Sequence, residues 1–317
     1  MEYFVTVEQL FEHLELENLT PEVSYKERKI TECDVNRPAL QLAGFFDYFD
    51  PTRLQIIGKV ESTYLEKLQD EETRHKAIKR FMDYKEIPCI IVCREEIDPD
   101  PYMLECAREN GIPIFKSPLA TSTLLAETNR WLHTELAQRI TLHGILVDIY
   151  GAGVLIMGES GIGKSEAALE LVRRGHRLVA DDAVEIRKIS ATHLLGTAPE
   201  VTRYFIEVRG IGIVDVKQLY GVGAIKHQKD IDLVVKLAHD SQEKTKDRLG
   251  LDEEFTNILG IDVPTNTIYV RPGRNIAVLC EVAAVNFREK KMGYNAAEVL
   301  ADRVREKIAR DTGAIFE

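Results

Sequence analysis

The sequence has 317 residues and a formal net charge of −11, with 44% hydrophobic and 29% charged residues. This length allows two domains with separate cores, and the composition is that of an ordinary soluble globular protein. The acidic balance argues against a nucleic-acid partner and against binding to an anionic membrane, because both interactions need a basic surface.

The cysteines and the N-terminus indicate a reducing, cytoplasmic location. The five cysteines are odd in number and contain no C-x-x-C pair, so their spacing predicts neither a disulfide framework nor a metal site. Cys89 and Cys93 flank an apolar run and are interpreted as core thiols. The N-terminus is acidic, unlike a signal peptide, and the longest apolar stretch, 145–157, is too short to span a bilayer.

The first half of the chain alternates predicted strands and helices. Thr6 and Gln9 form a capping-box pattern before a short helix. Apolar runs and helical patterns then follow in turn: strands at 54–58, 87–93 and 112–115, and helices at 64–84 and 103–110. This alternation predicts a small α/β domain with a largely parallel sheet. Three histidines lie singly in this half and are interpreted as solvated or packing residues: His13, His75 and His133.

A helical pattern over 121–139 predicts the connection between two domains. We place these domains at 1–132 and 133–317. The first carries no motif that assigns it a role. The fold class is therefore α/β, with a small N-terminal α/β domain followed by a larger domain that holds the motifs described next.

The second domain opens with two strands joined by a turn that is too short for a crossover. Apolar runs at 145–149 and 154–157 flank this turn and predict an antiparallel hairpin. A mixed sheet is therefore expected, unlike the parallel order of most nucleotide-binding folds. Further elements are predicted downstream: strands at 177–182, 205–208, 231–237 and 267–270, and helices at 276–290 and 296–310.

The second strand of the hairpin runs into a glycine-rich loop. Residues 158–165 read G-E-S-G-I-G-K-S and match G-x-x-x-x-G-K-[ST] at every specified position, and a helical pattern follows at once. Strand, loop and helix together are typical of phosphate binding; a glycine-rich turn without a ligand is the alternative. The residues expected to bind the nucleotide are Gly158, Glu159, Ser160, Gly161, Ile162, Gly163, Lys164 and Ser165, with Lys164 on the β- and γ-phosphates and Ser165 on a magnesium ion.

Carboxylates occur in or beside two of the predicted strands. Asp181 and Asp182 end an apolar run, where a carboxylate holds metal or activates a nucleophile in phosphoryl-transfer sites; a helix cap or a surface turn is the alternative. Because adjacent strand residues point to opposite faces, only one of the two is expected to face the phosphates. Glu207 precedes a glycine-rich bend and is interpreted either as a metal ligand or as a solvated strand residue.

Histidine and arginine side chains flank the same region. His143 precedes the hairpin, and a hydrogen-bonded structural role is the alternative to a catalytic one. Arg248 lies in the polar run 240–252, a candidate flexible loop, where a solvated charge is the default interpretation. Arg271 and Arg274 surround a Pro-Gly turn, an arrangement that suits anion binding. The alternative interpretation is the charged tip of a hairpin without a ligand.

Taken in order, these motifs resemble the HPr kinase/phosphorylase family of the bacterial phosphotransferase system. The resemblance is strongest from 143 to 274, where several motifs occur in register: G-E-S-G-I-G-K-S, A-D-D, E-V-R-G-I-G and V-R-P-G-R. It implies catalytic roles for His143, Lys164, Asp182 and Arg248, and metal ligation by Ser165 and Glu207. It also implies two functional loops, a kinase/phosphorylase loop and a phosphorylase loop: Glu207, Val208, Arg209, Gly210, Ile211 and Gly212 for the first, and Tyr269, Val270, Arg271, Pro272, Gly273 and Arg274 for the second.

The resemblance implies a reversible activity. Phosphate passes from ATP, or from pyrophosphate, to a regulatory serine of the carrier protein HPr, and inorganic phosphate removes it again to give pyrophosphate. Asp182 would accept the serine proton and return it in the reverse direction. The resemblance further implies Mg²⁺ or Mn²⁺, a nucleotide site like that of phosphoenolpyruvate carboxykinase, a homohexamer, fructose 1,6-bisphosphate as an effector, and a role in carbon catabolite repression and sugar uptake.

Three other functions remain open from the residues. A small-molecule kinase or carboxykinase would use the same loop on a metabolite. A nucleotide switch would bind and slowly hydrolyse its ligand, although the guanine-reading N-K-x-D motif is absent from the sequence. A pure interaction module with a degenerate loop is disfavoured by the intact Lys164 and Ser165.

Overall fold

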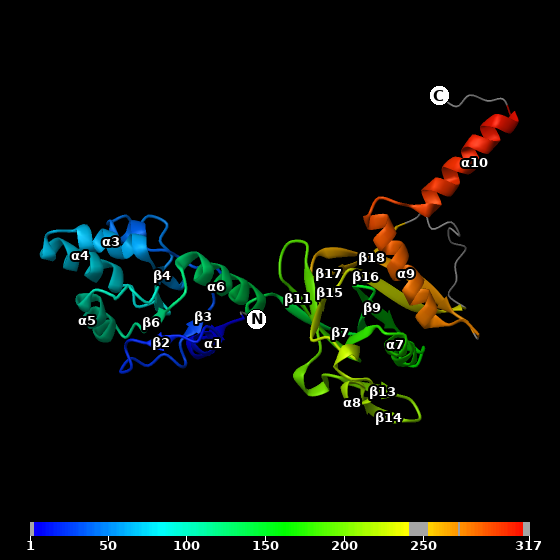
Figure 1. The fold of residues 1–317 in the computed structure, drawn as a ribbon, viewed down its shortest axis with the longest axis horizontal. Helices are drawn as coiled ribbons and strands as arrows, with labels where there is room; N and C mark the ends of the chain where they lie inside the picture. Colours follow the sequence, from blue (N-terminus) through cyan, green and yellow to red (C-terminus); the bar gives the residue numbers. More distant parts are fainter. Residues whose placement is uncertain (1–2, 241–252, 272, 313–317) are drawn as a thin grey trace. The chain divides into compact units, whose positions relative to one another are not determined.

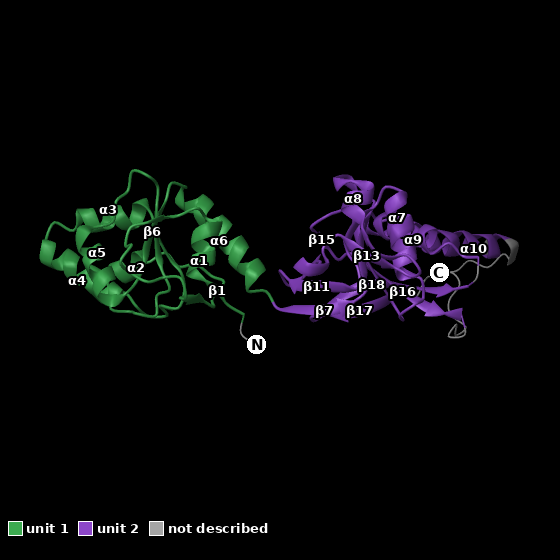
Figure 2. Cartoon of the chain, turned by 90° about the horizontal axis from the view of Figure 1, so that it is seen from below, with its two compact units in different colours: residues 1–137 green, residues 138–317 purple. Residues whose placement is uncertain are grey.

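The computed structural model describes residues 3–240, 253–271 and 273–312. The chain forms two compact units, 1–137 and 138–317 (Figure 2). Both units combine helices with sheets around their own hydrophobic clusters, which confirms the predicted α/β class (Figure 1). Among the described residues, no helix is both long enough and apolar enough to cross a membrane.

The first unit is built on a four-stranded sheet with the strand order β2-β6-β5-β4. Strands β4 (Gln55–Ile57), β5 (Ile90–Cys93) and β6 (Ile114–Ser117) are parallel, as predicted, and β2 (Glu17–Asn18) is antiparallel at the edge. A small pair of strands and six helices complete the unit: β1 (Val5–Thr6), β3 (Lys29–Ile30), α1 (Val7–His13), α2 (Ala39–Leu42), α3 (Lys59–Lys67), α4 (Glu71–Met82), α5 (Pro101–Asn110) and α6 (Thr121–Glu135).

Helices cover both faces of this sheet because its strands are apolar on both faces. Ile56, Ile91 and Phe115 pack in one core cluster with residues of α1 and α6. The alternate strand residues Ile57 and Val92 pack in a second cluster with residues of α3, α4 and α5. Cys89 and Cys93 are buried in the first cluster, so their interpretation as core thiols is confirmed.

Capping side chains fix where several of these helices begin. The capping box of Thr6 and Gln9 is confirmed at α1. The single helix expected over 64–84 is wrong, because the chain leaves the helix after Lys67 and begins again at Glu71. The Asp70 side chain caps the second helix by accepting a 3.0 Å hydrogen bond from the Thr73 amide, a signal that the apolar pattern did not reveal.

The second unit is built on a six-stranded mixed sheet with the strand order β10-β8-β9-β16-β18-β17. Strands β8 (Ile145–Ile149) and β9 (Ala152–Gly158) form the predicted antiparallel hairpin, whereas β9 pairs in parallel with β16 (Leu233–His239) on its other side. The mixed sheet is therefore confirmed. Its remaining strands are β10 (Arg177–Ala180), β17 (Glu254–Ile258) and β18 (Ile261–Val270).

The six-stranded sheet is covered by helices on one face and by a second sheet on the other. Residues of α7 (Lys164–Arg173) and α9 (Ile276–Lys291) pack with one set of its side chains. The opposite set, which includes Leu146 and Leu155, packs against the sheet β15-β12-β11-β7. The other elements of the unit are β7 (Arg139–His143), β11 (Ala183–Lys188), β12 (Leu194–Thr197), β13 (Phe205–Val208), β14 (Gly212–Asp215), β15 (Gln228–Asp230), α8 (Val216–Tyr220), α10 (Ala296–Thr312) and the short 3₁₀ helices Glu200–Thr202 and Val222–Ala224.

Candidate active site

The glycine-rich loop joins the carboxyl end of β9 to the start of α7. Gly163 occupies the cap position of α7 with φ of 103°, a left-handed conformation that is costly for other residues. Ala168 and Leu171 bury the apolar face of α7 against the sheet, which holds the helix start in place. The backbone N–H groups of the first turn therefore point into the loop, an arrangement suited to an anion.

A cavity of about 110 Å³ lies at this loop. Binding sites for whole small molecules usually measure about 300–1,000 Å³, so this cavity suits phosphoryl groups, and a nucleoside would lie outside it. Residues that are far apart in the sequence line it: His143, Ser160, Gly161, Gly163, Lys164, Ser165, Glu166, Asp181, Asp182, Glu207 and Arg209. Nine of the residues predicted for the site from sequence are thus brought to one place, together with Glu166 and Asp181.

Lys164 lies inside the loop and is largely buried. Its ammonium group donates hydrogen bonds to the carbonyl oxygens of Gly158, at 2.7 Å, and Glu159, at 3.0 Å. Burial lowers the pKa of Lys164, while the nearby carboxylates of Asp181 and Asp182 oppose that effect. The side chain is therefore held at the loop before any ligand arrives, so little rotamer entropy remains to be lost on binding.

Asp181 connects the loop to the β13–β14 hairpin. One carboxylate oxygen lies 3.4 Å from the Ser165 hydroxyl, and the other accepts a 2.9 Å hydrogen bond from the Glu207 backbone amide. The residue is only 6% exposed, and this burial raises the pKa of its carboxyl group, although the hydrogen bonds oppose the shift. The sequence analysis considered Asp181 but assigned it no specific role. In the structure it links the loop residue Ser165 to Glu207 of the hairpin.

Asp182 faces the same cavity as Asp181, so the expectation that only one of them would do so is wrong. The alternation of strand side chains does not apply here, because β10 ends at Ala180 and Asp182 adopts φ of 66°. Its side chain is 74% exposed, and its carboxylate lies 3.0 Å from Nδ1 of His143 at the end of β7. One aspartate is therefore buried, and its neighbour is accessible to solvent.

The hairpin of β13 and β14 supplies Glu207 and Arg209. Ile206 and Val208 are buried in the core beneath α7, so the alternation of the strand turns Glu207 and Arg209 away from that core. The Arg209 guanidinium lies 3.2 Å from the Ser160 hydroxyl and crosses Gly161, where an added Cβ atom would come within 2.5 Å of it. Arg209 thus closes over the glycine loop, a contact that its position in the sequence did not predict.

Of the remaining predicted site residues, those that the structure describes do not line this cavity. Arg248 and Pro272 lie outside the described residues. Arg271 pairs with Asp240, and Arg274 donates a 3.1 Å hydrogen bond to the Tyr269 carbonyl oxygen near the end of β18. β18 is the parallel neighbour of β16, which is itself the parallel neighbour of β9, so this segment lies on the same carboxyl edge of the sheet as the glycine loop.

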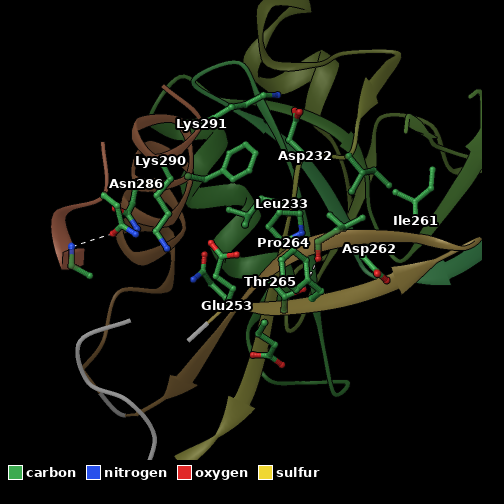
Figure 3. Close-up of a pocket in the computed structure, with 18 of the residues that line it drawn as sticks. Asp232, Leu233, Glu253, Ile261, Asp262, Pro264, Thr265, Asn286, Lys290 and Lys291 are labelled. Atoms are coloured by element: carbon green, nitrogen blue, oxygen red, sulfur yellow. Dashed lines mark hydrogen bonds between the residues drawn. The ribbon is translucent and has the colours of Figure 1, made fainter. Parts of the chain in front are cut away.

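A larger cavity, of about 600 Å³, lies elsewhere in the second unit (Figure 3). Residues of β17, β18 and α9 line it, among them Pro264, Asn286 and Lys290. None of the described residues of the phosphate-loop motif takes part in its lining. Its size alone therefore does not make it the reaction centre.

Replacing Asp181 with Asn is expected to make stability less dependent on pH. The native pKa of Asp181 is raised, so its contribution is fully favourable below the unfolded value of 3.8 and is lost as the pH rises through the native pKa. We therefore expect the free energy of unfolding of Asp181→Asn, measured with denaturant, to rise relative to that of the original protein as the pH increases from acid to neutral. Exposed Asp302→Asn in the same unit is the control, and an equal response of the two variants would contradict the prediction.

The fold and the glycine loop define a two-unit α/β protein in which a glycine-rich loop joins a strand of a mixed sheet to a helix. Residues 134–304 match the family profile of the HPr serine kinase C-terminal domain, and residues 5–132 match that of the HPr serine kinase N terminus. The chain therefore belongs to the HPr serine kinase family.

Named relatives and a solved structure resemble this chain. It is 54% identical to the HPr kinase/phosphorylase of Lachnoclostridium phytofermentans, over 97% of this chain and 99% of the relative. It is 50% identical to the HPr kinase/phosphorylase of Caldicellulosiruptor bescii, over 98% of this chain and 99% of the relative. The structure of the HPr(Ser) kinase/phosphatase from Coxiella burnetii aligns with 51% of this chain and 98% of its own at a TM-score of 0.47 and 36% identity.

Proposed function

We propose that this protein phosphorylates a regulatory serine of HPr and also removes that phosphate by phosphorolysis. The donor is ATP or pyrophosphate, and the reverse reaction consumes inorganic phosphate and yields pyrophosphate. The observation that supports the proposal is the single small cavity in which Lys164, Ser165, Asp182 and Glu207 converge. Family membership and the printed names of the relatives support the choice of HPr as substrate.

The loop and Lys164 position the donor. The backbone N–H groups at the start of α7 bind phosphate oxygens, and the Lys164 ammonium exchanges its carbonyl partners for the β- and γ-phosphates. Arg209 moves off Ser160 to admit the phosphates and then interacts with them. The base and ribose lie outside the cavity, which allows pyrophosphate to serve in place of ATP.

A divalent cation fits the oxygen groups of this cavity. The Ser165 hydroxyl and the Glu207 carboxylate line it together, and hard cations such as Mg²⁺ or Mn²⁺ prefer oxygen ligands of these kinds. When bound, the ion would neutralise charge on the transferring phosphate. Asp181 holds both partners in register, because it contacts the Ser165 hydroxyl and the Glu207 backbone at the same time.

Asp182 acts as the base in the forward reaction. It takes the proton of the HPr serine while the serine oxygen bonds to the γ-phosphorus and the bond to the leaving ADP breaks. In the reverse direction the same carboxyl group returns a proton to the serine oxygen as inorganic phosphate attacks the phosphorus. His143, 3.0 Å from this carboxylate, holds it in place. Arg248 completes the phosphate site, and Arg271 and Arg274 act mainly in the reverse reaction.

Assembly and control follow the family in this proposal. The protein works as a cytoplasmic homohexamer under control of fructose 1,6-bisphosphate and phosphate, within carbon catabolite repression, and its nucleotide site is related to that of phosphoenolpyruvate carboxykinase. The mixed sheet supports this last relation, since β8 and β9 form an antiparallel hairpin directly before the loop. The net charge of −11 supports the absence of a nucleic-acid partner.

Incubation of the full chain with purified HPr and Mg-ATP tests the function. We expect intact-mass spectrometry to show one added phosphate per HPr, on a serine. After removal of ATP, excess inorganic phosphate should reverse the modification with release of an equal amount of pyrophosphate. Unmodified HPr with phosphorylation of a metabolite would support a small-molecule kinase, and slow hydrolysis as the sole activity would support a nucleotide switch.

A further inference from the structure

Three potential metal ligands meet in the first unit, away from the phosphate loop. Cys33 and Asp34 lie in the segment after β3, and His133 lies in the last turn of α6. The Cys33 sulfur, a carboxylate oxygen of Asp34 and a ring nitrogen of His133 all lie within 4.8 Å of one another. The sequence had suggested a solvated or packing role for His133, which stands alone in its segment, and no metal site from the cysteines, which contain no C-x-x-C pair.

The spacing of these atoms suits a transition-metal ion. Zinc lies about 2.3 Å from sulfur and about 2.0–2.1 Å from nitrogen or oxygen, so its ligands are about 3.5 Å apart in a tetrahedral site. His133 Nε2 is already 3.7 Å from Oδ1 of Asp34. Both side chains are substantially exposed, 46% for His133 and 60% for Asp34, so small side-chain rotations bring them to bonding distance.

Cys33 is also the accessible thiol of this chain. The other four cysteines are buried, whereas Cys33 is partly exposed and packs at the edge of the core cluster that includes residues of α6. A thiolate, an imidazole and a carboxylate together favour a borderline ion such as zinc over magnesium. This set therefore differs in metal preference from the oxygen groups at the phosphate loop.

Arg53 lies beside the carboxylate of Asp34, on the side away from His133. Its guanidinium lies 4.0 Å from Oδ2 of Asp34, while the other oxygen, Oδ1, faces His133. The positive charge of Arg53 is shared with Asp50, to which its Nε donates at 3.3 Å. The positive charge of Arg53 favours the ionised carboxylate, the form that binds a metal.

We propose that Cys33, Asp34 and His133 bind one zinc-class divalent ion, with a water molecule in the fourth position. Binding exchanges the thiol proton of Cys33 for the metal, and His133 binds as the neutral imidazole. The ion would join the segment after β3 to the end of α6. Because these two segments are distant in sequence, the bound ion is expected to stabilise the first unit against unfolding.

Cobalt(II) titration of the full, metal-free chain tests the site, since a cobalt–thiolate bond gives a charge-transfer absorption band that carboxylate sites lack. We expect one equivalent of cobalt to produce this band, zinc to abolish it and magnesium to leave it unchanged. Cys33→Ser should remove the band, and His133→Gln, which removes a ligand, should weaken cobalt binding by more than the roughly 10–100-fold typical of losing a residue that only supports a ligand. His75→Gln is the matched control, because His75 also pairs with a carboxylate, Glu71, at 3.7 Å.

Two outcomes would overturn the proposal. One is a thiolate band in Cys33→Ser, which would place the metal on another cysteine. The other is the absence of a band in the original protein whose thiols have been shown to be reduced. His133→Gln changes an exposed side chain and should retain the native circular dichroism spectrum. Unaltered cobalt binding by this variant would therefore also contradict the proposal, even if Cys33→Ser folds poorly.

Discussion

Asp182→Asn is expected to lower the rate of HPr phosphorylation and of its reversal by about 10²–10⁴-fold, the range typical of a lost general base. Asparagine has nearly the same shape but cannot accept the proton. It also tolerates the left-handed backbone that Asp182 adopts, with φ of 66°, whereas alanine would add strain at this position. The loss should therefore appear in kcat, while nucleotide affinity in equilibrium binding stays within about threefold.

A comparison with His143→Asn separates the base from the residue that orients it. His143 contacts the Asp182 carboxylate but is placed on β7, outside the glycine loop. We expect a smaller loss of kcat for His143→Asn, again with nucleotide binding retained. Near-normal rates of Asp182→Asn in both directions, with nucleotide still bound, would disprove the assignment of Asp182 as the base.

Lys164→Met is expected to lower kcat/KM in both directions by about 10²–10³-fold, the range typical of losing one preorganised hydrogen-bond donor to an anionic group. Methionine keeps much of the length of the side chain in a position that is 7% exposed, but it removes the charge that meets the phosphates. Unlike Asp182→Asn, this change should also weaken binding of ATP and of pyrophosphate, because Lys164 contacts the donor in the ground state as well as in the transition state.

Lys188→Met is the matched control for this prediction. Lys188 also donates a hydrogen bond to a backbone carbonyl, that of Leu259 at 3.0 Å, but it lies away from the cavity. Its replacement should leave kcat/KM within about threefold while removing a comparable hydrogen bond. If both variants lost activity equally, the effect of Lys164 would be structural and its contact with phosphate would be refuted.

The sequence by itself determined the local features of this protein. The hairpin of β8 and β9 followed from a turn too short for a crossover, and the glycine-rich loop between a strand and a helix followed from a motif whose glycines and lysine have fixed spacing. The α/β class of both units followed from apolar periodicity. These features depend on neighbouring residues along the chain, so their signals are contained in short windows of sequence. The apolar pattern did not predict the break between α3 and α4, because the side chain that caps α4, Asp70, is polar and leaves that pattern unchanged.

The tertiary structure alone decided which side chains meet. Asp181 reaches Ser165 and Glu207, and Arg209 closes on Ser160, because β10 and β13 pack beside the loop. The sheet that covers the second face of the main sheet, and the meeting of Cys33 with His133, likewise depend on segments distant in sequence. Such contacts form when the apolar faces of distant elements are buried against one another. Because the hydrophobic effect is not directional, the periodicity of a segment shows which of its faces is buried but not which element covers that face.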